Sequence, residues 1–149
     1  MNLPRLLSAA AALVVLLALA PAGHAAGSAA SLKTRHGKIG TFLVDSKGKT
    51  LYLFQKDTSS KSRCSGTCAD DWPPLLTSGK PKGVSGVRKS LLGTTKRADG
   101  TTQVTYNKHP VYYYSGDTKA GDTGGQGVSA FGARWYAVNS AGKRVGSHY

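Results

Sequence analysis

The chain has 149 residues, and 20 lysines and arginines against seven acidic residues give it a formal net charge of +13. All seven acidic residues are aspartates. The length suits one domain with a modest core, which excludes a large multidomain architecture. The charge favours anionic partners such as wall polymers or anionic membrane surfaces, and the alternative is a basic surface that only keeps the protein soluble.

Residues 1–26 have the composition of an export signal. Arg5 supplies a short positive region, residues 9–20 are an uninterrupted apolar run, and small residues follow as a cleavage site. The run is too short to stay as a membrane span, and no cysteine precedes Cys64 to carry a lipid. We therefore expect a secreted monomer with a cleaved signal peptide, no lipidation cysteine and no transmembrane span. Nucleic acid is not an expected partner, because exported proteins rarely meet it.

The next segments predict a flexible basic arm at residues 27–38 and a single domain at residues 39–149. The domain begins with two β-prone runs, residues 41–44 and 50–54, joined by a turn that contains Gly48.

The later elements are mostly short strands and glycine-rich turns. Trp72 precedes two prolines, so residues 72–76 are expected as an extended edge segment with Trp72 in the core. In chain order the other expected elements are a short helical turn near residues 64–71, a hairpin of residues 87–97 and 101–106 around Asp99-Gly100, an aromatic strand at 111–114, a glycine-rich loop at 115–132 and a strand at 134–138.

The strand pattern also contains an internal repeat. The first copy reads Tyr52-x-Phe54-x-x-Asp57, the second reads Tyr112-x-Tyr114-x-x-Asp117, and a tryptophan, Trp72 or Trp135, follows each. No segment of the domain has a sustained helical period. We therefore expect an all-β, mainly antiparallel fold with little helix. Two related β-hairpin-based repeats, at about residues 39–77 and 97–142, are expected to pack as one sandwich or open barrel.

These motifs, with the segment Cys-Ala-Asp-Asp-Trp-Pro-Pro-Leu that starts at Cys68, resemble a bacterial family. It is the "secreted repeat of unknown function" family, also described as predicted lipoproteins with a Tyr-x-(Phe/Trp/Tyr)-x-x-Asp motif. The resemblance runs from about residue 39 to residue 142 and implies export and a duplicated β fold, without an activity. The chain departs from this family in lacking a lipidation cysteine, and in having Lys108 where the relatives commonly have a turn glycine.

Asp57 and Asp117 occupy equivalent positions, each just after an aromatic strand. The plainer prediction is that each carboxylate accepts backbone N–H groups and closes the turn that leaves its strand. The alternative is a paired-carboxylate site that binds a cation or a cationic ligand.

The motif aromatics are expected in the core, because they recur at every second strand position. Trp72 and Trp135 are expected as core pillars of the two repeats. The same aromatic character also suggests a ligand surface, for which Tyr113, His109, Trp72 and Trp135 are the candidates.

Cys64 and Cys68 predict a local disulfide, since an exported chain meets an oxidising compartment. The alternative is a metal or redox site in which the two thiolates combine with His109, or with His36, to hold copper or zinc.

No catalytic residues are predicted. The loop at residues 121–127 lacks the strand and helix that a phosphate-binding loop needs, and no nucleophile elbow is present. We therefore expect no cofactor and no enzyme. The expected function is a non-enzymatic binding module for anionic cell-envelope material, and the alternative is an extracytoplasmic redox or metal-handling protein that uses Cys64 and Cys68.

Overall fold

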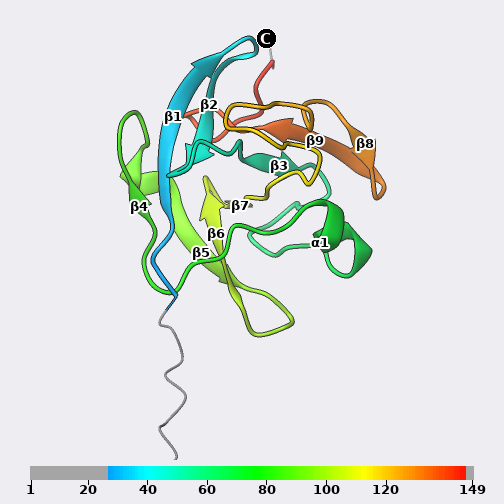
Figure 1. The fold of residues 1–149 in the computed structure, drawn as a ribbon. Coiled ribbons are helices and arrows are strands. Elements are labelled where there is room, and N and C mark those ends of the chain that lie inside the picture. The colour runs from blue at the N-terminus through cyan, green and yellow to red at the C-terminus, as the bar shows by residue number, and fades with distance from the viewer. Residues whose placement is uncertain (1–26, 147–149) are drawn as a thin grey trace, which may run out of the picture.

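The computed structural model describes residues 27–146, which form three small sheets and little helix (Figure 1). All strand pairs but one are antiparallel in this part of the chain, and the strands do not close into a ring. The helices described are α1 (Thr67–Asp71) and a single 3-10 turn, η1 (Lys89–Leu91). The predicted all-β, mainly antiparallel fold class is confirmed. The predicted signal peptide at residues 1–26 lies outside the described residues.

The first sheet has the order β2–β1–β4 and overturns one prediction. Residues 27–38 are not a flexible arm, because β1 (Ser31–Gly37) pairs antiparallel with β2 (Gly40–Asp45) from Leu32 to Gly37 and along the whole of β2. The composition of β1 is polar, and only Leu32 is fully buried. Its backbone nevertheless satisfies the hydrogen-bonding groups of β2, four of whose residues are buried. Polar composition alone was therefore a poor guide to disorder.

The other two sheets carry the rest of the predicted strands except the one at residues 111–114, where the structure has only isolated bridges at Tyr112. β3 (Tyr52–Phe54), β9 (Ala133–Ala137) and β8 (Ser129–Ala130) form one sheet in that order. The third sheet has the order β5 (Leu92–Lys96), β6 (Thr102–Tyr106) and β7 (His109–Pro110). In the first sheet, the two-residue strand β4 (Lys82–Gly83) pairs parallel with β1.

The two repeats meet where their motif strands pair. The backbone N–H of Tyr52 donates to the carbonyl of Tyr112 at 2.8 Å, and the N–H of Tyr112 donates to the carbonyl of Tyr52 at 2.9 Å. This reciprocal antiparallel pair joins the first residues of the two motifs. The segment at residues 72–76 pairs beside it through Pro74 and Tyr112, and Trp72 is buried as predicted.

Alternate side chains of the motif strands enter two different cores. Tyr52, Phe54 and Tyr112 belong to an aromatic core, whereas Leu53 and Val111 belong to an aliphatic core. Because successive strand residues point to opposite faces, these strands form a central layer that is buried on both sides. The predicted core position is confirmed for these three aromatics, whereas Tyr114 is only partly buried and packs against the aromatic core.

Each core is closed by a different part of the chain. The disulfide segment and the glycine-rich loop cover the aromatic core, through Cys64, Cys68 and Val128. Leu91 and Leu92, at the junction of η1 and β5, pack against the aliphatic core.

The turn between β6 and β7 has a strained backbone. Asn107 and Lys108 have φ values of 48° and 65°, which a two-residue turn between antiparallel strands requires and which glycine adopts most easily. We expect Lys108→Gly to raise the free energy of unfolding by about 0.5–1 kcal/mol, because it relieves a left-handed non-glycine residue. Urea denaturation measures the effect.

Lys47→Gly is a matched control, because Lys47 is also an exposed turn residue but has no positive φ. It should leave stability unchanged or lower it. A loss of stability in Lys108→Gly would show that the lysine side chain stabilises the fold by a contact that outweighs the backbone strain.

Candidate functional site

The two family motifs are connected by a reciprocal pair of buried hydrogen bonds. The hydroxyl of Tyr52 donates to Oδ2 of Asp117 at 2.5 Å, and the hydroxyl of Tyr112 donates to Oδ2 of Asp57 at 2.6 Å. Each tyrosine therefore bonds to the aspartate of the other repeat. Both tyrosines have an exposed fraction of 0%, so neither hydroxyl can rely on solvent for an acceptor.

The second oxygen of each aspartate closes its own turn. Oδ1 of Asp57 accepts the backbone N–H of Arg63 at 2.7 Å, and Oδ1 of Asp117 accepts the N–H of Gly124 at 2.8 Å. These contacts are the turn-closing role that the sequence predicted. Internal donors therefore bond both oxygens of each carboxylate, and the alternative of a cation site stays a prediction.

Burial governs the titration of this network. It raises the pKa of the Tyr52 and Tyr112 hydroxyls well above the usual range, and the neighbouring aspartates raise it further. Burial also raises the pKa of Asp57, although the hydrogen bonds from Tyr112 and from the backbone of Arg63 act in the opposite direction.

The tryptophans that follow the motifs form the centre of a stack of four rings. Trp72 and Trp135 lie face to face with their centroids 4.0 Å apart and a 5° angle between their planes. Phe54 stacks on the outer side of Trp135 at 4.0 Å, and Tyr114 stacks on Trp72 at 4.4 Å. The phenylalanine of the first repeat thus contacts the tryptophan of the second, and the reverse holds for Tyr114.

The prediction that the tryptophans, Tyr113 and His109 form a ligand surface is partly wrong. Trp72 and Trp135 have exposed fractions of 1% and 0%, so they act as the core pillars that the sequence also predicted. The hydroxyl of Tyr113 is engaged, since it donates to Oδ2 of Asp45 at 2.9 Å. His109 is a half-buried residue that lines two open cavities of about 350 and 500 Å³ beside Asp57, and its place in a ligand surface stays a prediction. Burial lowers the pKa of His109, and the charge of Asp57 partly offsets that effect.

Cys64 and Cys68 form the predicted disulfide, with a Cα–Cα distance of 5.2 Å. Their sulfur atoms are bonded to one another, so this state offers no thiolate to a metal. Among residues 27–146, no group of three or more His, Cys, Asp or Glu side chains could hold a metal ion. The alternative metal set of Cys64, Cys68 and His109 is therefore wrong for the oxidised chain.

The glycine-rich loop packs against the aromatic core. A Cβ atom on Gly125 would lie 2.8 Å from the ring of Tyr52 and 2.9 Å from that of Trp72. The N–H of Gly125 also donates to the Tyr52 hydroxyl at 3.2 Å. Glycine is required here because the backbone approaches the aromatic rings so closely.

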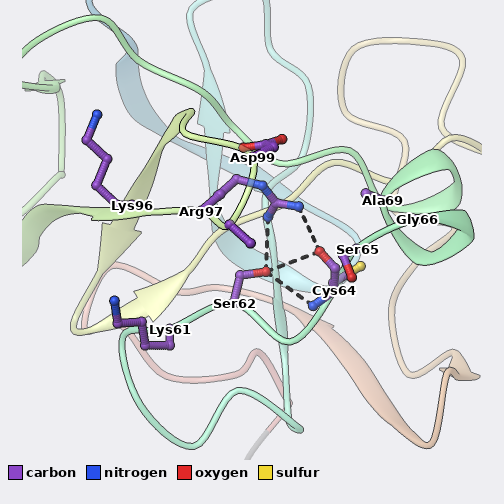
Figure 2. Close-up of a pocket in the computed structure, with 10 residues that line it drawn as sticks. Lys61, Ser62, Cys64, Ser65, Gly66, Ala69, Lys96, Arg97 and Asp99 are labelled. Atoms are coloured by element: carbon purple, nitrogen blue, oxygen red, sulfur yellow. Dashed lines mark hydrogen bonds between the residues drawn. The ribbon is translucent and has the colours of Figure 1, made fainter.

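Sequence reasoning missed an open groove beside the disulfide. The groove has a volume of about 570 Å³ and lies between the segment that enters α1 and the turn of the β5–β6 hairpin (Figure 2). Three cationic side chains, Lys61, Lys96 and Arg97, line it together with one acidic side chain, Asp99. The adjacent Lys96-Arg97 pair was visible in the sequence, but only the fold brings it to Cys64 and Lys61.

Arg97 is fixed in this groove by neutral groups. Nη1 donates to Oγ of Ser62 at 3.0 Å and to Oε1 of Gln103 at 2.8 Å, and Nη2 donates to the carbonyl of Cys64 at 2.7 Å. Figure 2 shows the guanidinium held over the disulfide segment. Because none of these acceptors is charged, they orient the cation without neutralising it.

Asp99 is the one acidic side chain of the groove lining. Hydrogen bonds from the side chain and backbone of Thr101 hold the pKa of Asp99 below its usual value, so it is ionised at neutral pH. The lining still carries more positive than negative charge.

The reciprocal hydrogen bonds predict a matched pair of effects. We expect Tyr52→Phe and Tyr112→Phe each to lower the free energy of unfolding by about 1–3 kcal/mol, because each leaves a buried carboxylate oxygen without its donor. Tyr114→Phe is the control, since no hydrogen bond to its hydroxyl is found in the described residues. Denaturant unfolding measures the free energy of unfolding of all three variants. Equally small losses in all three would contradict a structural role for the Tyr52–Asp117 and Tyr112–Asp57 hydrogen bonds.

The raised pKa of Asp57 predicts a dependence of stability on pH. A carboxyl whose pKa is higher in the folded chain contributes stability that is present below its unfolded pKa, near 3.9, and is lost as pH rises through the folded value. The stability of the wild type relative to Asp57→Asn should therefore fall as pH rises from 3 to 7. Urea midpoints of both proteins across this pH range test the prediction. If the wild type gains stability relative to Asp57→Asn as pH rises, the hydrogen bonds to Asp57 outweigh the effect of its burial on the pKa.

The comparisons with known proteins agree with this duplicated architecture. A family model described as "Secreted repeat of unknown function" matches the chain twice, at residues 33–76 and 93–139. No match was found among curated proteins or among solved structures. Among residues 27–146, no helix has the length and apolar character needed to cross a bilayer. On this evidence the chain belongs to the family of secreted repeats of unknown function.

Proposed function

We propose that this protein is a non-enzymatic binding module for anionic polymers of the cell envelope, with the groove beside the disulfide as the binding site. The observation that carries the proposal is Arg97, which lines the groove and whose guanidinium is held by three neutral acceptors. Lys61 and Lys96 add two exposed cations to the same lining.

The geometry suits a phosphate or carboxylate group on a chain. An open groove admits a polymer that passes through it, whereas a closed cavity would select a small molecule. Asp99 at the turn would repel an anion at that end, which favours contact with Lys61 and Lys96. In Figure 2 these two lysines lie on the side of the groove away from α1.

The wall of the groove is rigid, which supports the recognition of a ligand by a small number of charged side chains. The disulfide, the hydrogen bonds of Arg97 and the packing of Cys64 in the aromatic core hold one wall of the groove in place. A pre-arranged site loses less conformational entropy when it binds than a mobile one does.

The proposal predicts a selective effect of two exposed lysines. We expect the double variant Lys61→Ser, Lys96→Ser to weaken binding to poly(glycerol phosphate), a soluble phosphodiester polymer, by about thirtyfold. Each lost contact removes roughly 1 kcal/mol of charge attraction in water. Isothermal titration at 50 and 300 mM salt measures the change, and binding should weaken with salt.

The matched control is Lys47→Ser, Lys89→Ser, which removes two exposed lysines that do not line the groove. It lowers the net charge equally but should keep nearly all the affinity. Equal losses in the two double variants would show that total charge, and not the groove, determines binding. Binding that survives high salt unchanged would argue against any anionic partner.

A further inference from the structure

The tip of the β8–β9 hairpin combines two unfavourable features in one residue. Its two-residue turn consists of Phe131 and Gly132, with φ values of 56° and 88°. Glycine adopts such angles freely, but a bulky side chain rarely does. Phe131 is also 37% exposed, although it is a large apolar residue.

Neither the positive φ of Phe131 nor the exposure of its ring stabilises the fold. Ala130 and Ala133, which flank the turn, pack against the aromatic core, whereas Phe131 lies outside both cores. Asparagine or a second glycine would make the same turn with less strain. In Figure 1 this hairpin lies at the right edge of the molecule, where its tip is well separated from the first sheet.

The surroundings of the tip are basic. Nζ of Lys56 donates to the carbonyl of Phe131 at 3.4 Å, which places an ammonium group beside the turn. Exposed Arg134 follows three residues after Phe131, and its Nη1 donates to the carbonyl of Gly127 at 3.4 Å. The nearest acidic residue to Lys56 in sequence, Asp57, is buried and bonded to Tyr112 and Arg63.

Acidic groups are absent from this part of the sequence. The last of the seven aspartates is Asp122, so no acidic side chain occurs in residues 123–149. An exposed aromatic ring with an ammonium group beside its turn and an exposed arginine three residues later complements the interface of an anionic bilayer. There an apolar ring can enter the boundary of the acyl chains while cations contact the head groups.

We propose that the tip of the β8–β9 hairpin docks on anionic lipid membranes, with Phe131 inserted and with Lys56 and Arg134 on the lipid head groups. The contact is weak and reversible, because one partly inserted ring supported by two cations is a small anchor. This surface shares no residue with the groove of the proposed function, so the two proposals stand separately.

Co-sedimentation with vesicles tests the docking. Wild-type protein should bind vesicles of phosphatidylglycerol and phosphatidylcholine, and bind those of phosphatidylcholine alone at least fivefold less. Phe131→Asn should lower partitioning to the anionic vesicles by about fivefold or more, while its thermal stability stays equal or rises, because asparagine tolerates the left-handed region.

Two controls separate insertion from general effects. Val84→Ser removes another exposed apolar side chain, 50% exposed and adjacent to β4 on the opposite side of Figure 1, and should leave partitioning unchanged. The double variant Lys56→Ser, Arg134→Ser should reduce partitioning by about thirtyfold, on the basis of roughly 1 kcal/mol for each cation near an anionic membrane surface.

A fluorescence measurement reports insertion directly. Trp72 and Trp135 are buried, so lipids with brominated acyl chains should leave wild-type emission nearly unquenched. In Phe131→Trp the new indole should be quenched by the same vesicles.

Three results would overturn the proposal. They are wild-type protein that does not bind anionic vesicles, Phe131→Asn that binds as well as wild type, and vesicle binding that is lost in the groove variant Lys61→Ser, Lys96→Ser but kept in Phe131→Asn. The last result would assign lipid binding to the groove. Failure of the groove variant to lose polymer affinity would affect only the proposed function.

Discussion

Two buried tyrosine hydroxyls need acceptors in a core that solvent does not reach, and each finds the aspartate of the other repeat. This exchange, Tyr52 to Asp117 and Tyr112 to Asp57, explains why the motif spaces an aromatic residue and an aspartate as it does. An unpaired hydroxyl or carboxylate at this depth would be strongly destabilising, so neither repeat is complete without the other. The duplication is therefore a structural requirement and not a pair of independent units.

The aromatic stack also pairs residues of different repeats. Phe54 stacks on Trp135 and Tyr114 stacks on Trp72, so each repeat places its ring on the tryptophan of the other. Large rings supply much buried area in a chain with few leucines in its domain, and their stacking adds directional stabilisation. The close approach of Gly125 to these rings explains why a glycine-rich loop, rather than a further strand, covers this side.

The groove and the hairpin tip both depend on this core but are built differently. The groove is held by a disulfide whose cysteines pack in the aromatic core, and by an arginine bonded to neutral oxygens, so its charge is placed with little freedom. The hairpin tip instead projects a strained phenylalanine away from the core. The molecule thus has a fixed cation at the groove and an exposed aromatic ring at the hairpin tip.

The sequence by itself determined the all-β class and the duplicated motif, and it favoured the disulfide and buried tryptophans without excluding a metal site or a ligand surface. These features follow from local spacing, from period-two alternation and from the redox compartment that an export signal implies. Sequence could not identify β1 as a strand, because its residues are polar and its stability comes from backbone pairing with β2. It also left the partners of Asp57 and Asp117 open, since the donors lie 55 and 65 residues away. Only the tertiary structure decided those partners, and only it brought Lys61, Lys96 and Arg97 around one groove, because long-range pairing of the two repeats sets which distant residues meet.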